Sequence, residues 1–209
     1  MHNFQYVPQS VTKPVRLELE ELIKDVQNYL SDYFTFRFDI VGSAKRNMIT
    51  CNVDSNIGFD FDYNIEINDP DENYSAEEIK RYLMEGFQQC MRRYGYTKCE
   101  NSTRVITIKK VDYSLSRIEH SCDLAIVYNF VEDGVKKQQY IRFNKPNNSY
   151  SWELQPNGFD LEDKIGEIKR QKLWDDVRDM YLELKCTDKI GKKSRSLFAE
   201  AVNNIYNQI

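Results

Sequence analysis

The chain has 209 residues, of which 29 are Lys or Arg and 33 are Asp or Glu, giving a formal net charge of −4 and a pI of about 5.4. Domains that coat nucleic acid by charge alone usually have a pI above about 9, so the composition argues against that class and against long DNA or RNA as a partner. The sequence holds no apolar run near the roughly 20 residues that span a bilayer and no signal-peptide pattern at its start, so we expect a cytoplasmic protein with no membrane partner.

The first part of the chain predicts a helix, a strand and a loop. Residues 1–10 have the composition of a loose arm, and Pro14 suits the first turn of a helix that apolar spacing extends over residues 14–32. Apolar and polar residues alternate over residues 34–40, which is typical of a strand. The polar residues 44–57 predict a loop or short excursion.

A second alternating segment, residues 59–67, predicts a strand with one entirely polar face. Turn-forming residues follow it, and the sequence Ser75-Ala-Glu-Glu78 is a capping box that begins a helix. Gly95 is the expected end of this helix, because glycine tolerates the left-handed conformation that follows many helices.

Two further segments, residues 105–108 and 123–128, are rich in apolar and β-branched residues and predict strands. Glu132-Asp-Gly134 predicts a hairpin turn that leads into a strand over residues 139–143. Residues 144–157 predict a loop.

From Asp160 onward the apolar spacing is helical, with a basic break at Gly191-Lys-Lys-Ser194 before the last helix. The predicted fold class is therefore α/β or α+β, with a small mixed sheet, flanking helices and a helical C-terminal tail. We expect a core over residues 1–150 and a helical appendage over residues 151–209 that packs on it.

The predicted strand over residues 59–67 carries the first candidate site. Residues two apart on a strand share a face, so Asp60 and Asp62 lie side by side and repel unless a cation lies between them. Adjacent carboxylates suit Mg²⁺, which takes oxygen ligands and leaves room for substrate phosphates. The plain alternative is an exposed strand whose polar face contacts water.

Gly42-Ser43 ends the strand that precedes this one. Glycine at a strand end lets backbone N–H groups approach a phosphate, and the serine hydroxyl is one more donor. Lys45 and Arg46 follow at once and can neutralise a polyphosphate. By itself a Gly-Ser pair is usually only a turn, and its place before the acidic strand is what favours a phosphate site.

Asp123 is a third candidate, because a charge at the edge of the apolar run 124–128 needs a reason. It is either a solvent-facing acid or a third metal ligand beside the attacking hydroxyl. Two ions about 3.5–4 Å apart would stabilise the attacking and leaving oxygens of an in-line displacement.

Together these features resemble the DNA polymerase β-type nucleotidyltransferase superfamily, whose pattern is an apolar residue before Gly-[Gly/Ser], an acid-apolar-acid strand and a third acid on a later strand. The resemblance covers roughly residues 15–128, and the helical tail is similar to the helices appended in many members. It implies transfer of a nucleotidyl group from an NTP with release of pyrophosphate. It further implies that Gly42 and Ser43 bind the triphosphate, that Asp60 and Asp62 hold two Mg²⁺ or Mn²⁺ ions, and that Asp123 completes one ion site and helps to activate the acceptor.

Two other functions stay open. A metal-dependent nuclease of the D…E-x-K type is suggested by Glu167-Ile-Lys169 and Glu183-Leu-Lys185, although both tripeptides lie in segments of helical spacing, whereas that chemistry wants them on a strand. A non-catalytic nucleotide-binding or partner-binding module on the same fold is the second alternative, and the retention of all three aspartates argues against it.

The acceptor is left open as a small molecule, a short oligonucleotide, a tRNA end or a protein side chain. Lys192 and Lys193, just before the last predicted helix, are further candidates for phosphate binding, with a solvated basic loop as the alternative. Tyr140, Tyr150 and Trp152 can stack on a base or pack in the core.

Overall fold

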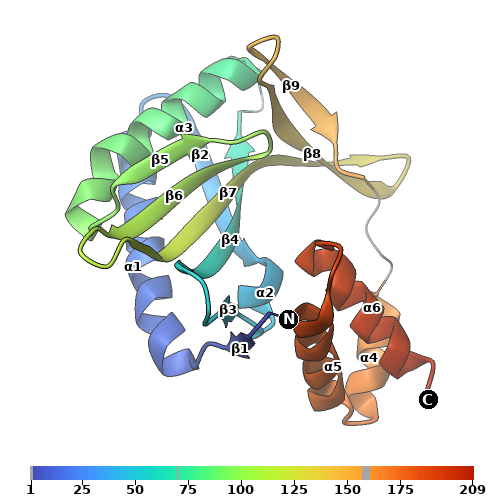
Figure 1. The fold of residues 1–209 in the computed structure, drawn as a ribbon. Helices are drawn as coiled ribbons and strands as arrows, with labels where there is room; N and C mark the ends of the chain where they lie inside the picture. The colour runs from blue at the N-terminus through green and yellow to red at the C-terminus, as the bar shows by residue number, and fades with distance from the viewer. Residues whose placement is uncertain (1, 70, 157–160) are drawn as a thin grey trace. The chain divides into compact units, whose positions relative to one another are not determined.

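A computed structural model describes residues 2–69, 71–156 and 161–209. The strands are β1 (Phe4–Tyr6), β2 (Thr35–Val41), β3 (Thr50–Asn52), β4 (Ile57–Asn68), β5 (Lys98–Asn101), β6 (Val105–Asp112), β7 (Arg117–Glu132), β8 (Val135–Asn144) and β9 (Ser149–Leu154). The helices are α1 (Gln9–Tyr29), α2 (Gly42–Lys45), α3 (Ala76–Cys90), α4 (Glu162–Arg170), α5 (Trp174–Thr187) and α6 (Ser194–Tyr206), with a 3-10 helix, η1 (Met91–Tyr94), after α3. Figure 1 shows these elements, coloured from blue at the N-terminus to red at the C-terminus.

The chain forms two compact units. The first contains Met1–Tyr6, Thr50–Ser55 and Pro156–Ile209, and the second contains Val7–Ile49 and Asn56–Gln155. The second unit is a mixed sheet of strand order β2-β4-β7-β6-β5, extended by β8 on β7 and by β9 on β8. Only the β4–β7 pairing is parallel among the described ladders of this sheet. The predicted mixed α/β architecture is confirmed.

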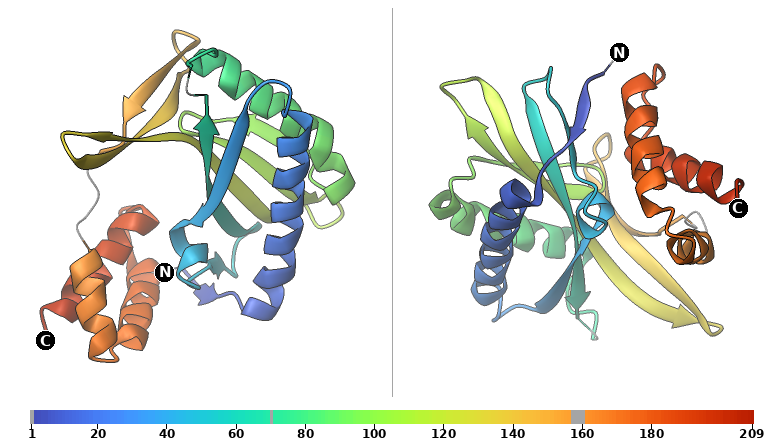
Figure 2. Two further views of the ribbon diagram at one scale, coloured as in Figure 1. Left: turned by 180° about the vertical axis from the view of Figure 1, so that it is seen from behind. Right: turned by 90° about the horizontal axis from the view of Figure 1, so that it is seen from below.

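Helices α1 and α3 pack against each other and cover one face of this sheet (Figures 1 and 2). The helices cover this face because it is apolar, as β4 shows. Every second residue of β4 on this face is buried, namely Phe59, Phe61, Tyr63, Ile65 and Ile67. Each large apolar side chain contributes about 1.5–3 kcal/mol when fully buried. The residues between them, Asp60, Asp62, Asn64 and Glu66, lie on the opposite face, which we call the polar face. A slip of one residue would bury these four, so the register is strongly specified.

Local signals in the sequence are confirmed where the chain turns. Ser75 and Glu78 form the capping box at the start of α3, each side chain bonding to the backbone N–H of the other residue. Gly95, with φ of 79°, ends η1. The β7–β8 hairpin turns at Asp133 and Gly134, whose φ angles of 53° and 76° suit a two-residue turn.

The predicted loose arm and the predicted start of the first helix are both wrong. Residues Phe4–Tyr6 form β1, which pairs with β3 inside the region 44–57 that was predicted as a loop. Helix α1 begins at Gln9, directly after Pro8, and Pro14 lies inside it. The apolar pattern that carries the helix starts only at Leu19, so the sequence places its beginning too late.

Three corrections concern the later strands. Strand β9 occupies much of the predicted loop 144–157, whose last residue lies outside the described part of the chain. Strand β5 was not predicted. Strand β7 begins at Arg117, so Asp123 lies in its interior rather than at its start. These strands are defined by pairing with partners, which the local sequence does not encode.

The first unit combines three helices with the β1–β3 ladder, as helical spacing predicted for the C-terminal segment; its predicted start, Asp160, lies outside the described residues. The Tyr6 hydroxyl donates to the Arg178 carbonyl at 2.7 Å, and Lys185 Nζ donates to Thr50 Oγ1 at 2.8 Å, so α5 and the ladder are bonded together. Within the described ranges, no helix has the length and apolarity of a membrane-spanning segment.

Candidate active site

Strand register brings the predicted acidic residues together on the polar face of the second unit. In the parallel β4–β7 pair, Asp62 lies opposite Asp123, and Asp60 lies opposite Ser121. On the other side of β4, Asp62 lies opposite Val41 of β2. Because Gly42 follows Val41 directly, Asp62 sits between the Gly42-Ser43 turn and Asp123.

The turn at Gly42 depends on having no side chain. Gly42 has φ of 64°, and a Cβ added there would lie 3.0 Å from Asp62 Cγ and 3.2 Å from Asp62 Cβ. The turn is held by the Ser43 carbonyl, which accepts from the N–H groups of Arg46 at 3.2 Å and Met48 at 2.9 Å. A non-glycine residue at position 42 would therefore be strained and would displace the Asp62 carboxylate.

Burial and repulsion make Asp62 hard to ionise. Its pKa is raised to about 6, mainly by loss of hydration and then by the negative charges of Asp123 and Asp60, while Arg46 acts in the opposite direction. Burial also raises the pKa of Asp123. Carboxylates whose pKa is raised in this way are typical of sites that hold a cation or move a proton.

Two hydroxyls contact the aspartates, and the sequence did not identify either. Thr107 Oγ1 on β6 donates to Asp123 Oδ1 at 2.6 Å, and this bond opposes the rise in the pKa of Asp123. Ser121 Oγ on β7 donates to Asp60 Oδ1. Ser121 shares a face with Asp123 two residues later, which is a detectable signal, whereas Thr107 is connected to the site only through the β6–β7 pairing.

A cation also reaches this site from β6. Lys109 lies opposite Ser121 in the β6–β7 ladder, and its charge lowers the pKa of Asp123. Lys109 Nζ forms an ion pair with Glu100 at 2.6 Å. Sequence reasoning missed Lys109 because its nearness to Asp123 arises only from strand pairing.

The carboxylates have the donor chemistry of a Mg²⁺ site, since all are oxygen ligands on neighbouring rigid strands. Within residues 2–69, 71–156 and 161–209, however, no group of three or more His, Cys, Asp or Glu side chains forms a ready arrangement for a metal ion. Two of the three acids instead bond to the hydroxyls of Thr107 and Ser121. The residue types fit the ion.

Of the predicted basic residues, Arg46 lies close enough to act on the charge of Asp62, and Lys45 is an exposed residue of α2. Lys192 and Lys193 belong to the other unit. Lys192 Nζ pairs with Glu200 at 2.7 Å, and Lys193 is the residue before α6. Their part in phosphate binding stays a prediction.

The structure also places the E-x-K tripeptides and the aromatic residues that the sequence singled out. Both E-x-K tripeptides lie in helices α4 and α5, as their spacing predicted, so neither stands on a strand beside an aspartate. Tyr140 is buried on β8, and Tyr150 stacks on Phe143 with ring centroids 4.6 Å apart. Trp152 contacts the ring of Tyr128 edge-on.

No protein-family model and no curated protein matches the sequence. Solved structures do match. The GTP-bound form of Vibrio cholerae DncV has 16% identity and a TM-score of 0.58, over 98% of this chain and 53% of that one. Escherichia coli DncV with 3'-deoxy GTP has 18% identity and a TM-score of 0.57, over 93% and 53% of the two chains.

The Elizabethkingia meningoseptica CdnE cyclic dinucleotide synthase, solved with GTP and Apcpp, has 16% identity and a TM-score of 0.52, over 90% of this chain and 69% of that one. A CD-NTase of Bradyrhizobium diazoefficiens, CdnG, is matched over only 40% of its length. This chain therefore spans about half the length of most of these structures. At such identities the likeness concerns the fold alone, and the mixed α/β fold of this chain is the nucleotidyltransferase fold of these structures, as the sequence predicted.

Proposed function

We propose that this protein is a metal-dependent nucleotidyltransferase that moves a nucleotidyl group from an NTP to a hydroxyl acceptor and releases pyrophosphate. The observation that carries the proposal is the position of Asp62, between the Gly42-Ser43 turn on one side and Asp123 on the other. A turn whose backbone N–H groups could bind phosphate thus lies next to carboxylates that could hold a metal, and phosphoryl transfer requires both.

Each residue has a distinct role in this proposal. The backbone N–H groups of the Gly42-Ser43 turn and the serine hydroxyl bind the triphosphate, and Lys45 and Arg46 neutralise its charge. Asp60, Asp62 and Asp123 hold Mg²⁺ or Mn²⁺, in two ions. The metal supplies charge neutralisation at the attacking and leaving oxygens. Lys192 and Lys193 are weaker candidates for the phosphate tail.

In the proposed reaction Asp123 is the base. The acceptor oxygen forms a bond to the α-phosphorus as the bond from that phosphorus to the pyrophosphate oxygen breaks, and the acceptor proton passes to the Asp123 carboxylate. Because Thr107 donates to Oδ1 of Asp123, we assign Oδ2 as the atom that faces the acceptor hydroxyl.

The acceptor class to test first is the ribose hydroxyl of a second nucleotide. The support for it is that this fold is shared with a cyclic dinucleotide synthase and with proteins solved with GTP. The other acceptors, namely a small molecule, a short oligonucleotide, a tRNA end or a protein, are alternative outcomes of the same assay.

The test incubates α-labelled ATP and GTP with Mg²⁺ and then with phosphatase. Label that resists phosphatase marks a new phosphodiester, and pyrophosphate release marks transfer to any added acceptor. Asp62→Asn should abolish both signals. Glu66→Gln is the matched control, because Glu66 lies on the same face of β4, pairs with Arg37 and is about 13 Å along the strand. If wild-type protein binds NTP and releases no pyrophosphate with any acceptor pool, the non-catalytic binding module replaces the enzyme.

A further inference from the structure

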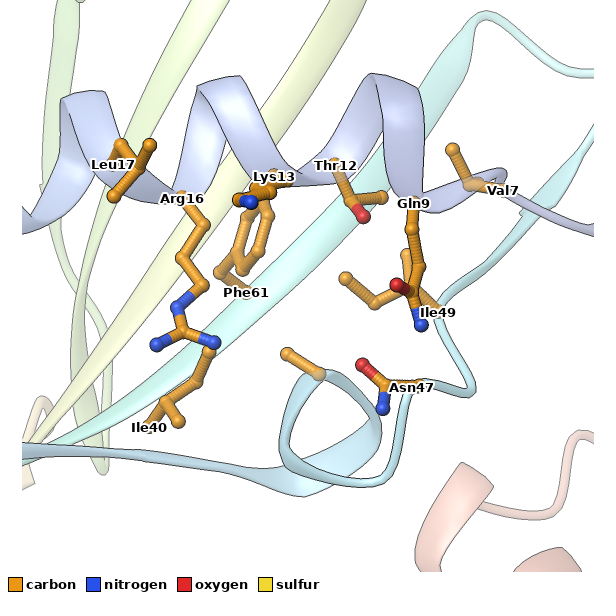
Figure 3. A pocket seen from close by; sticks show the side chains of 11 residues that line it. Val7, Gln9, Thr12, Lys13, Arg16, Leu17, Ile40, Asn47, Ile49 and Phe61 are labelled. Carbon is orange, nitrogen blue, oxygen red and sulfur yellow. The ribbon is translucent and has the colours of Figure 1, made fainter.

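A cavity of about 200 Å³ lies in the second unit, between α1, β2, β4 and the segment that follows α2. Its wall includes the apolar side chains of Ile40 and Phe61 from the sheet and of Ile49 from the segment after α2. Figure 3 shows polar side chains extending into it from one face of α1: the amide of Gln9 and the hydroxyl of Thr12 point away from the helix axis toward the cavity.

The charged groups around this cavity are cationic. Lys13 and Arg16 line it from α1, and no Asp or Glu is among the described residues that do so. Arg16 Nε donates to Glu20 at 2.7 Å, which fixes the guanidinium in place. Its far end points toward Ile40 (Figure 3). The Arg16 guanidinium, ion-paired with Glu20 through Nε, therefore lies beside an apolar wall.

Thr12 adds a hydroxyl to the cavity wall. The residue is only 9% exposed, and within the described part of the chain no hydrogen bond from its hydroxyl to another protein group is found, although its N–H donates to the Pro8 carbonyl. The hydroxyl is therefore available to bond to a polar group in the cavity. Asn47, with φ of 56°, faces it from across the cavity (Figure 3).

The cavity also contacts the segment that carries the candidate phosphate-binding turn. Ala44 and Asn47 line it, and they are bonded to each other through the Asn47 N–H and the Ala44 carbonyl at 3.1 Å. Gly42 and Ser43 precede them directly. Phe61 points into the cavity while Asp60 and Asp62 face the opposite way, so the cavity and the carboxylates lie on opposite faces of β4.

We infer that this cavity binds a small organic anion, and that its occupancy is transmitted through Ala44 and Asn47 to the Gly42-Ser43 turn. The ligand joins one carboxylate or phosphate, placed against Lys13 and Arg16, to an apolar body against Ile40 and Phe61. Ligand sites for drug-sized molecules have about 300–1,000 Å³, so this cavity suits a single ring or a short chain. Binding does not depend on the proposed transfer reaction.

The test uses benzoate and phenyl phosphate as probes, with benzyl alcohol as the neutral analogue and acetate as the anion without an apolar body. Binding is measured by nuclear magnetic resonance titration of the full chain without nucleotide. For ligands of this size we expect benzoate or phenyl phosphate to bind with a dissociation constant of about 0.1–10 mM. Benzyl alcohol and acetate should bind at least tenfold more weakly.

Two variants on α1 locate the site. Arg16→Gln should weaken the anionic probes at least tenfold, and Thr12→Val, which is nearly isosteric, should weaken them several-fold. Lys24→Gln is the matched control, since Lys24 is an exposed lysine of the same helix, paired with Glu21 and outside the cavity. Equal loss in Lys24→Gln would show a general charge effect and would overturn the inference.

Transmission to the turn has its own readout. On addition of benzoate, the backbone amide resonances of Gly42 and Ser43 should shift together with those of Ala44 and Asn47. Shifts confined to residues that line the cavity would refute the link to the turn, and equal binding of benzyl alcohol would identify a plain apolar cavity. Neither result bears on nucleotidyl transfer, so failure of this site and failure of the proposed function are separable.

Discussion

At the residue scale, the ionisation of Asp62 sets the electrostatic character of the site. The carboxylate is partly buried beside two other acids, and its pKa of about 6 lies above its ordinary value of 3.8. The folded protein therefore binds this proton more tightly than the unfolded chain does. The corresponding stabilisation is complete below about pH 4 and is lost as the pH rises through about 6.

Asp62→Asn should consequently stabilise the metal-free protein at pH 7.5 by about 1–2 kcal/mol, after allowance for solvent screening, and should have little effect near pH 4. Urea unfolding with chelator present, at several pH values, measures this difference. Burial lowers the pKa of His120 to about 4, so His120 makes the free energy of unfolding rise with pH. This contribution is the same in wild type and in Asp62→Asn, and it cancels in the difference between them. Asp39→Asn, at an exposed residue of β2, is the control and should leave the free energy of unfolding unchanged at each pH. Equal stability of Asp62→Asn and wild type at pH 7.5 would contradict the claim that the ionised Asp62 carboxylate destabilises the metal-free fold.

Gly42 offers a second test with a matched partner. Both Gly42→Ala and Gly134→Ala place a side chain at positive φ, at a cost of about 1–2 kcal/mol. Only at Gly42 would the new Cβ meet a neighbour, the Asp62 side chain, because nothing lies within 4 Å at Gly134. Gly42→Ala should therefore lose more stability than Gly134→Ala, and it alone should weaken NTP binding at least tenfold. If calorimetry finds that Gly42→Ala and Gly134→Ala bind NTP with similar affinity, Gly42 is not part of the nucleotide-binding site.

At the scale of elements, the β6–β7 ladder sets how Asp123 is presented. Thr107 is buried and lies opposite Asp123, to which its hydroxyl donates. A donor to the ionised carboxylate lowers its pKa and fixes its orientation. Thr107 thus positions the Asp123 carboxylate, and in the proposed reaction it would act only through Asp123.

Thr107→Val keeps the side-chain shape and removes the donor, so the pKa of Asp123 should rise. Thr107→Ser should restore it. Carboxyl-carbon resonances recorded during a pH titration of the metal-free protein measure this shift directly. In an active enzyme the acidic limb of the kcat profile should move to higher pH, with KM for the NTP changed little. An unchanged Asp123 titration in Thr107→Val would remove the positioning role.

At the scale of the whole molecule, the polar face concentrates negative charge where the proposed triphosphate binds. Three acids on neighbouring strands would repel an NTP unless a cation bridges them. ATP or GTP should therefore bind weakly in chelator, and Mg²⁺ or Mn²⁺ should tighten binding at least tenfold. Calorimetry with and without chelator decides this. Equal affinity in the two conditions would favour a metal-independent binding module.

The three aspartates should differ in what their loss does. Asp60→Asn and Asp62→Asn remove ligand charge and should lower turnover by several orders of magnitude. Asp123→Asn should reduce turnover at least as much as NTP affinity, since its oxygen is assigned to the acceptor in the transition state. All three variants should remain folded without metal. Wild-type turnover in all three, or unfolding in chelator, would make these residues structural.

The sequence by itself determined the features that depend on short spacings. The period of two in β4 placed Asp60 and Asp62 on one face, Ser75 and Glu78 capped α3, and Asp133-Gly134 turned the β7–β8 hairpin. In each case the interacting residues are at most three positions apart. Backbone geometry and hydrogen bonding then fix the outcome locally, whatever surrounds them.

Only the tertiary structure decided which strands are neighbours. The β1–β3 ladder joins Phe4 to Asn52, and strand pairing brings Thr107 to Asp123. Short edge strands such as β1, β5 and β9 have weak patterns of their own and exist because a partner satisfies their backbone groups. The site is divided in the same way: its acids and its Gly-Ser turn follow from local pattern, whereas the Asp62–Asp123 register, the hydroxyls that orient the acids and the cavity behind the turn arise from packing between distant segments.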